Sequence, residues 1–265
     1  MINEKEILIN NLRINYKIAG EGEPLLILHG WDGSSNSWRE VQKILAKEKI
    51  KVIVPDLPGF GKSISPPSAW TVSDYSRFVL NFINKIGEEK VNLLGHSFGG
   101  RVAIKFAVSY PEKLKKLILC ASAGVKHPLT LSQLIILKVS IVGNFFFSKR
   151  PFKRLKDIAQ NFFYTLLRHK DYAKAKGVMK ETLKKVLEED LKPELCQIKA
   201  NTLLIWGEKD KAVPLEDAHL MKETIPQSVL EIIPGASHTP NLEFPEKLAE
   251  IVRNFLANYE RISNE

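Results

Sequence analysis

Short apolar runs rich in β-branched residues recur along the chain, separated by longer stretches with helical periodicity. Such runs are typical of buried strands in a mostly parallel sheet. An Asn10-Asn11 pair between the first two runs is typical of a hairpin turn. We therefore expect eight strands, at Ile7–Ile9, Leu12–Lys17, Leu25–Leu28, Lys51–Val54, Val91–Leu94, Leu117–Cys120, Thr202–Trp206 and Val229–Ile233.

Helical periodicity fills the intervals between most of these strands. Several of the periodic stretches open with Ser, Thr or Pro, which favour helix N-termini. The alternation predicts an α/β fold, with a mostly parallel eight-stranded sheet and helices on both faces. The predicted helices are Ser37–Lys47, Thr71–Ile86, Gly99–Tyr110, Leu215–Thr224 and Pro245–Tyr259.

The strand rhythm stops between Gly124 and Pro193, where only helical patterns are found. A chain of 265 residues commonly forms one α/β domain with an insertion. We expect residues 1–124 and 193–265 to form the core domain and residues 125–192 to form an inserted helical cap. Its predicted helices are Leu131–Val142, Phe152–Leu167, Asp171–Met179 and Thr182–Glu188.

Composition and cysteine use suggest an ordinary globular protein of a reducing compartment. Hydrophobic residues make up 44% and charged residues 26% of the chain. The first nine residues carry charges where a signal peptide needs an apolar run. Cys120 and Cys196 lie 76 residues apart with no paired spacing, which favours buried free thiols over a disulfide or a metal site. These features predict a cytoplasmic location.

The net charge of +9 is concentrated in one segment: residues 126–192 hold 15 Lys and Arg against 6 Asp and Glu. The simplest interpretation is a solvated helix face. Because basic residues at 149–156 follow the apolar Phe145–Phe147, contact with an anionic membrane surface or an anionic or lipid-like substrate is the functional alternative. Polar residues interrupt the apolar run Leu129–Phe147, so we expect no transmembrane helix there. No motif accompanies the charge that would indicate nucleic-acid binding.

The chemistry is indicated first by Gly95–Gly99, a Gly-x-Ser-x-Gly motif that follows a predicted buried strand and precedes a predicted helix. A strand that turns sharply into a helix holds its serine in a strained conformation, and the flanking glycines allow close backbone approach. The following helix directs its positive end toward Ser97. We expect Ser97 to be a nucleophile.

A serine nucleophile needs a base and a group that orients the base. His238 follows the last predicted strand, at the sheet edge where strand ends gather, and we expect it to be the base. The acid is expected to be Asp210, a few residues beyond another strand, with Glu208 and Asp56 as weaker alternatives. The chain order Ser, Asp, His agrees with this fold. Three other histidines are expected to be packed or solvated, His127 and His169 in the cap and His219 on a helix. His96, directly before the nucleophile, is expected to line its turn.

Charge that develops on a substrate oxygen needs hydrogen-bond donors. The backbone N–H of Phe98, directly after the nucleophile, is one donor by position. The second is expected from the loop His29-Gly30-Trp31, where Gly30 lets the N–H of Trp31 turn toward the same point. A plain tight turn is the alternative for this loop.

With these residues in place, the chain resembles the α/β-hydrolase superfamily, in particular its capped, cofactor-free branch of esterases and carbon–carbon bond hydrolases. The resemblance implies the triad Ser97, Asp210 and His238, oxyanion donors at Trp31 and Phe98, a substrate pocket between sheet and cap, and no cofactor or metal. Ser97 stands where haloalkane dehalogenases and epoxide hydrolases carry Asp, which argues against those reactions. The motifs are His29-Gly30 with Trp31, Asp56–Ser63, Gly95–Gly99, Gly207–Asp210 with Val213-Pro214, and Gly235–His238.

We therefore expect hydrolysis of a small to medium carboxylic ester, thioester or lactone through an acyl-enzyme on Ser97. One alternative is cleavage of a carbon–carbon bond in a diketone ring-cleavage product, which an anion-binding pocket under a basic cap favours. The other is a ligand sensor that retains the triad with little turnover. The core motifs do not choose among these substrates, and the sequence leaves the oligomeric state open.

Overall fold

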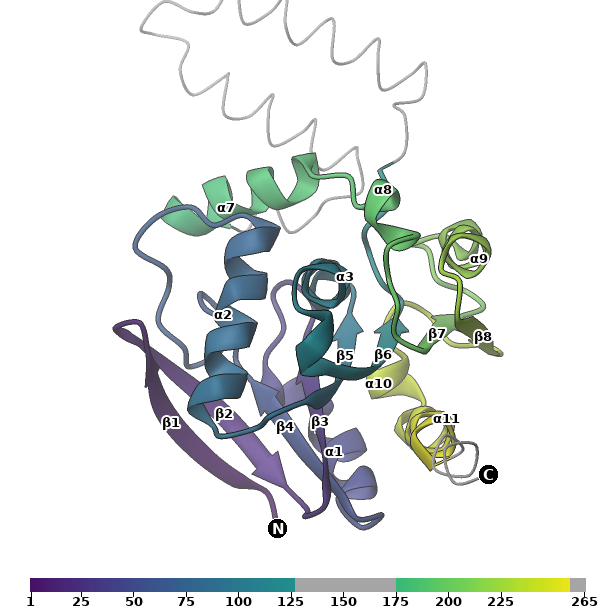
Figure 1. The fold of residues 1–265 in the computed structure, drawn as a ribbon, viewed down its shortest axis with the longest axis horizontal. Coiled ribbons are helices and arrows are strands. Elements are labelled where there is room, and N and C mark those ends of the chain that lie inside the picture. The colour runs from purple at the N-terminus through teal and green to yellow at the C-terminus, as the bar shows by residue number, and fades with distance from the viewer. Residues whose placement is uncertain (127–174, 258–265) are drawn as a thin grey trace, which may run out of the picture.

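The structure is a computed structural model that describes residues 1–126 and 175–257. Within these residues, eight strands form one sheet in the order β1-β2-β4-β3-β5-β6-β7-β8 (Figure 1). The predicted fold class and the eight strands are confirmed. The strands are β1 (Asn3–Ile9), β2 (Leu12–Ala19), β3 (Glu23–Leu28), β4 (Ile50–Pro55), β5 (Val91–His96), β6 (Leu114–Cys120), β7 (Thr202–Gly207) and β8 (Ser228–Ile233).

Strand direction explains where the functional loops gather. The pairs β1–β2 and β2–β4 are antiparallel, and all pairs from β4 through β3, β5, β6 and β7 to β8 are parallel. Every residue of β5 and β7 is buried. Parallel strands covered on both faces read as continuous apolar runs, and their carboxyl ends meet at one edge of the sheet.

The opening hairpin turns at Asn10 and Asn11, whose φ angles are +48° and +65°. Asparagine tolerates this left-handed conformation, which a tight hairpin turn requires. The first strand is longer than the predicted Ile7–Ile9, because residues Asn3–Glu6 pair with β2 although all four are exposed. A polar strand at the sheet edge carries no hydrophobic signal.

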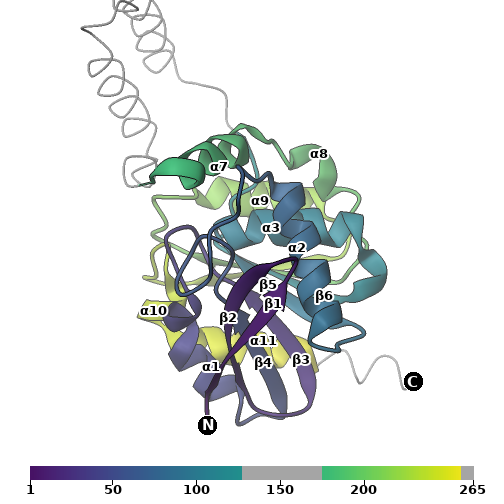
Figure 2. The same cartoon turned by 90° about the vertical axis from the view of Figure 1, so that its left-hand side faces the viewer.

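Helices cover both faces of the sheet (Figures 1 and 2). The apolar side chains of α2, α3 and α9 belong to one buried cluster, and those of α1 and α11 belong to the other. Three short helical segments, η2, α8 and α10, were not predicted, since three or four residues show no period. The predicted helix Ser37–Lys47 covers only the last two residues of η1. The bounds are η1 (Ser35–Trp38), α1 (Arg39–Leu45), α2 (Val72–Lys85), α3 (Phe98–Ser109), η2 (Pro111–Lys113), α7 (Gly177–Glu188), α8 (Lys192–Leu195), α9 (Leu215–Thr224), α10 (Pro240–Glu243) and α11 (Pro245–Ala257).

One helix, α7, replaces parts of two predicted ones. The prediction of a helix over Asp171–Met179 is wrong at residues 175 and 176, which are not helical, and α7 runs without a break through Thr182 to Glu188. Thr182 is accommodated inside the helix because its hydroxyl donates to the carbonyl of Val178 at 2.9 Å. The predicted cap helices Leu131–Val142 and Phe152–Leu167, like residues 171–174, lie outside the described residues.

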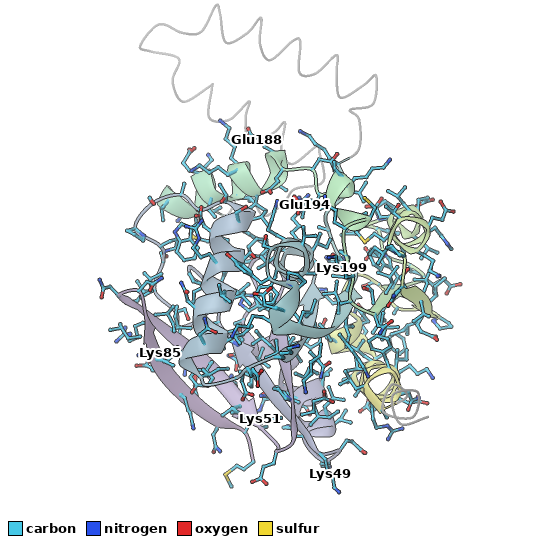
Figure 3. All side chains as sticks on the ribbon, viewed as in Figure 1. Lys49, Lys51, Lys85, Glu188, Glu194 and Lys199 are labelled. Carbon is cyan, nitrogen blue, oxygen red and sulfur yellow. The ribbon has the colours of Figure 1, made fainter. Side chains whose placement is uncertain are left out.

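The two chain segments that flank the undescribed stretch are bound to each other and to α3. The N–H of Leu191 donates to the carbonyl of Gly124 at 2.9 Å, and the Arg101 guanidinium donates to the carbonyl of Glu189 at 2.8 Å. Lys105 pairs with Glu189 at 2.8 Å and with Glu194, which Figure 3 labels on α8. These contacts attach both segments to the helix that begins beside Ser97.

Both cysteines are free thiols, as predicted. Cys120 is buried, but the prediction of a buried Cys196 is wrong, because that residue is exposed directly after the short helix α8. Within residues 1–126 and 175–257, no helix is both long enough and apolar enough to cross a membrane. The apolar run Leu129–Phe147 and the basic residues 149–156 lie outside the described residues.

Candidate active site

Ser97 occupies a sharp turn between β5 and α3. Its φ and ψ angles are +53° and −112°, a strained conformation for a residue with a side chain. Gly95 and Gly99 make the turn feasible. A Cβ on Gly95 would lie 2.4 Å from the carbonyl oxygen of Gly99, and one on Gly99 would lie 2.2 Å from that of Leu28. Backbone packing therefore requires the two glycines of the motif.

Hydrogen bonds fix the backbone of Ser97 at both its N–H and its carbonyl group. Its N–H donates to the carbonyl of Cys120 at 3.1 Å. Its carbonyl accepts from the N–H groups of Gly100 at 3.0 Å and Ala123 at 3.1 Å. These hydrogen bonds use only backbone atoms, so they leave the Ser97 hydroxyl at the tip of the turn available for other contacts.

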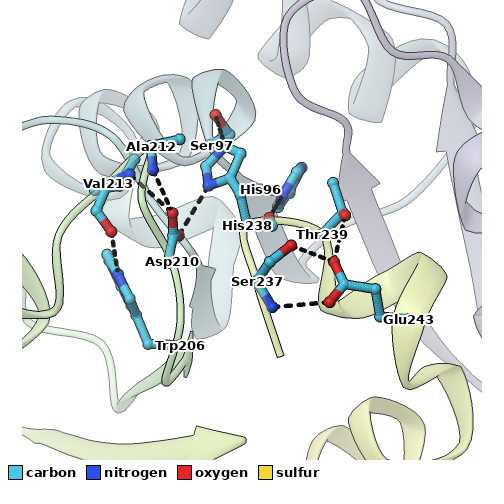
Figure 4. Close-up of polar contacts among 10 residues, drawn as sticks. All are labelled: His96, Ser97, Trp206, Asp210, Ala212, Val213, Ser237, His238, Thr239 and Glu243. Carbon is cyan, nitrogen blue, oxygen red and sulfur yellow. Dashed lines mark hydrogen bonds and ion pairs between the residues drawn. The ribbon is translucent and has the colours of Figure 1, made fainter. Parts of the chain in front are cut away.

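His238 lies between Ser97 and Asp210 (Figure 4). Its Nε2 is 3.0 Å from Oγ of Ser97, and its Nδ1 is 2.9 Å from Oδ2 of Asp210. A carboxylate only accepts hydrogen bonds, so Nδ1 carries the proton and Nε2 is free to accept from the serine hydroxyl. The structure thus brings together three side chains that are 28 to 141 residues apart in the chain.

Backbone amides of its own loop orient the Asp210 carboxylate. Its Oδ1 accepts from the N–H of Ala212 at 2.8 Å and of Val213 at 3.0 Å, which leaves Oδ2 for His238. The indole of Trp206, in β7, donates to the carbonyl of Val213 at 3.1 Å. The Asp210 side chain is fully buried, whereas that of His238 is 25% exposed.

The two alternative acids have other partners. Oε2 of Glu208 accepts from the N–H of Gly235 at 2.8 Å. The Asp56 carboxylate accepts from the N–H of Ser35 at 2.6 Å and of Lys62 at 2.9 Å, and from the amide of Asn15 at 3.0 Å. Burial acts to raise the pKa of Asp56, but these hydrogen bonds outweigh it and hold the pKa below its usual range. Asp56 therefore organises its own loop.

Trp31 and Phe98, the predicted oxyanion donors, contact each other through their rings. The ring centroids are 5.1 Å apart, and Phe60 lies within 4.8 Å of Trp31 and 5.9 Å of Phe98. Gly30 faces the serine, because a Cβ there would lie 3.3 Å from Cβ of Ser97. Neither N–H forms a hydrogen bond with another part of the described chain.

The His29 ring binds backbone groups on both of its nitrogens, beside this loop. Its Nε2 accepts from the N–H of Leu57 at 3.0 Å, so its Nδ1 carries the proton and donates to the carbonyl of Gly30 at 2.7 Å. Burial lowers the pKa of His29, which keeps the ring neutral. The ring fixes the start of the loop that presents Trp31.

The role of His96 was not foreseen from the sequence. It is the last residue of β5, and its Nε2–H donates to the carbonyl of His238 at 2.8 Å (Figure 4). Their ring centroids are 5.2 Å apart. Burial, assisted by the nearby His238, lowers the pKa of His96 to about 4. A neutral ring thus supports the backbone of His238; the only sequence signal for it is a histidine directly before the serine.

His96 makes the stability of the protein depend on pH. Because its pKa is about 4 in the folded state and 6.5 for a histidine in free solution, the unfolded chain binds an extra proton between these values. We expect the free energy of unfolding to fall as the pH drops from 6.5 to 4, and His96→Asn to remove about 2–3 kcal/mol of that fall. Denaturation with urea at pH 7 and pH 4.5 measures it.

The exposed His219 on α9 offers a matched control, and His219→Asn is denatured at the same two pH values. If the free energy of unfolding of His96→Asn fell with pH as steeply as that of the wild type, the assignment of a buried neutral ring would be contradicted.

His127 and His169 lie outside the described residues. In residues 1–126 and 175–257, no cluster of three His, Cys, Asp or Glu residues suited to a metal ion is found.

A hydrogen-bonded Ser-His-Asp group at the carboxyl edge of such a sheet defines a class of hydrolytic enzymes. Residues 23–245 match the family model for the alpha/beta hydrolase fold, and the chain belongs to this family of hydrolases.

Relatives of known activity span nearly the whole chain. A 2-hydroxy-6-oxo-6-phenylhexa-2,4-dienoate hydrolase of Burkholderia cepacia is 28% identical and covers 97% of this chain and 95% of its own. The crystal structure of a serine hydrolase involved in carbazole degradation is 26% identical, with a TM-score of 0.74 over 97% of this chain and 99% of its own. A thermophilic esterase from Thermogutta terrifontis is 25% identical, with a TM-score of 0.71 over 97% and 98%.

Proposed function

We propose that this hydrolase cleaves a small to medium carboxylic ester, thioester or lactone through an acyl-enzyme on Ser97. The observation that carries the proposal is the continuous hydrogen-bonded path from Asp210 through His238 to Ser97, with contacts of 2.9 Å and 3.0 Å. A serine is a weak nucleophile unless such a path takes its proton.

In the first step, Oγ of Ser97 attacks the carbonyl carbon while its proton passes to Nε2 of His238. The imidazolium that forms is stabilised by Asp210, whose buried carboxylate is already aligned by the amides of Ala212 and Val213. The proton then passes to the leaving alcohol, and the acyl group remains on the serine. A water molecule, deprotonated by His238, releases the acid and restores the hydroxyl.

The N–H groups of Trp31 and Phe98 hold the oxygen that becomes negative in each step. The ring contact between these two residues supports this role, because it fixes the spacing between the loop of Trp31 and the start of α3 at Phe98. The helix α3 starts at Phe98 and adds the positive end of its dipole. Removal of one such donor typically costs about 10²–10³-fold in turnover.

The surroundings of the serine favour an uncharged acyl group. Among the described residues, aromatic rings are in contact around the two donors, namely those of Trp31, Phe98, Phe60 and Tyr75. The Tyr75 hydroxyl donates to the carbonyl of Pro58 at 2.9 Å. Arg101, four residues after the serine, is directed to the carbonyl of Glu189 instead. An ester with an apolar acyl group fits this environment better than an anionic dienoate.

Carbon–carbon bond hydrolysis is the second candidate, favoured by the relatives named for dienoate cleavage. In that reaction the same serine, histidine and donors would act on a ketone of a ring-cleavage diketone.

We also propose that residues 1–124 and 193–265 form the core domain, that residues 125–192 form the cap, and that the substrate binds between them. The chemistry assigned to these residues needs no cofactor.

A kinetic panel tests the proposal. The p-nitrophenyl esters from acetate to palmitate and a 2-hydroxy-6-oxo-dienoate are assayed with the wild type and with Ser97→Ala. We expect turnover of short and medium esters that is lost in the variant. Turnover of the dienoate alone would replace the ester assignment by the second candidate. Ligand-dependent stabilisation without turnover of either class would reject both in favour of a sensor.

A further inference from the structure

The loop that carries His238 is fixed in its first half by the loop that carries Asp210. The N–H of Lys209 donates to the carbonyl of Ala236 at 2.8 Å. The backbone at Gly207 touches the same loop, since a Cβ there would lie 2.2 Å from the carbonyl oxygen of Ser237. These contacts end at Ser237, directly before the histidine.

The second half of the loop is held by Glu243, at the end of α10 (Figure 4). Its Oε2 accepts from the N–H of Ser237 at 2.8 Å. Its Oε1 accepts from the hydroxyl of Thr239 at 2.7 Å and from the hydroxyl of Ser237. One carboxylate therefore binds both residues that flank His238.

The turn from Thr239 to Glu243 does not need the contacts of the Glu243 carboxylate in order to close. The carbonyl of Thr239 already accepts from the N–H groups of Leu242 at 2.9 Å and Glu243 at 3.1 Å, which forms the turn from the backbone alone. Three donors, led by the Ser237 hydroxyl, hold the pKa of Glu243 below its usual range, so the group is an anion at neutral pH. Hydrogen bonds to a charged acceptor are stronger than neutral ones.

We propose that Glu243 is a positioning residue that holds the His238 loop so that the imidazole stays between Asp210 and Ser97. The inference rests on the proposed function. It adds a residue that touches none of the reacting atoms and acts only through the two neighbours of the base. His96 binds the carbonyl of His238 itself, so the backbone of the base is held by a second side chain as well.

Without this carboxylate, the loop from Ser237 to Thr239 loses three hydrogen bonds, and the imidazole is held less well against the serine. Displacement of a catalytic group by about 1 Å can cost 10²-fold in rate. We expect Glu243→Ala to lower kcat by about 10–100-fold with KM unchanged, because the carboxylate does not contact the acyl group. Glu243→Gln keeps an oxygen for the two hydroxyls but loses the acceptor for the Ser237 N–H. Its kcat should therefore lie between that of the wild type and that of Glu243→Ala.

The experiment compares both variants with Glu246→Gln, which removes the same charge from an exposed position at the start of α11. The readouts are kcat and KM for p-nitrophenyl acetate, the melting temperature, and the NMR signal of the proton on Nδ1 of His238. We expect this signal to be sharp in the wild type and in Glu246→Gln, and broadened in Glu243→Ala. The kinetic assays are run well below each melting temperature.

Two results would overturn the inference. One is a sharp Nδ1 proton signal in Glu243→Ala like that of the wild type, which tests the loop without any substrate. The other is a normal kcat in Glu243→Ala with only a lower melting temperature, which would make Glu243 a purely structural residue. Failure of the proposed function is recognised separately, by a wild type that does not turn over the ester while the NMR comparison still decides the role of Glu243.

Discussion

Replacement of Ser97 by alanine is expected to reduce turnover by about 10⁴–10⁶-fold, because the proposed nucleophile and the proposed base, His238, would act as a unit. The fold should be unaffected. The hydrogen bonds of Ser97 to Cys120, Gly100 and Ala123 all use its backbone, and alanine retains them. The φ angle of +53° costs alanine about as much as it costs serine. Steady-state kinetics with the best ester of the panel, together with thermal unfolding, measure both effects.

Ser109 supplies a matched control at the other end of the same helix, where it is exposed. Ser109→Ala should keep wild-type turnover. If Ser97→Ala retained more than a few per cent of the activity while remaining folded, the nucleophile assignment would be abandoned.

Asp210→Asn is expected to lower kcat by about 10⁴-fold while leaving the fold intact. The reason lies in the direction of the carboxylate. The N–H groups of Ala212 and Val213 bind one oxygen, so the asparagine oxygen stays with them and its NH₂ group turns to His238. A donor at Nδ1 forces the proton of the imidazole onto Nε2, which then cannot accept the serine proton.

Glu208→Gln is the comparison for this prediction, because Glu208 lies in the same loop and Gln keeps an acceptor for the N–H of Gly235. Its turnover should stay close to that of the wild type. A larger loss in Glu208→Gln than in Asp210→Asn would transfer the role of the acid to Glu208. Measurement of kcat and KM for both variants decides between them.

The central strands were predictable because they are buried on both faces and therefore read as apolar runs. β5 and β7 illustrate this, since every residue in each is buried. The polar half of β1 was missed, because its pairing with β2 leaves no apolar pattern. The short helix α10 was also missed, and with it the residue that binds both neighbours of His238.

The three candidate catalytic residues were also chosen from the sequence, because each follows a predicted strand and their order matches one fold. Their catalytic roles stay predictions until the variants are measured. The choice of Asp210 over Glu208 rested on position alone in the sequence. In the structure, Glu208 faces Gly235 and Asp210 faces His238.

Local sequence thus determined the order of strands and helices, the turn that presents Ser97, and the loops in which its partners are found. These depend on periodicity and on glycines, and both act within a few residues. Only the tertiary structure decided which polar atoms meet across the sheet edge. The contact of His96 with the carbonyl of His238 spans 142 residues. Such contacts depend on strand order and loop packing, which no local pattern encodes. Local sequence therefore indicated the candidate catalytic groups, and the fold determined which side chains hold them in place.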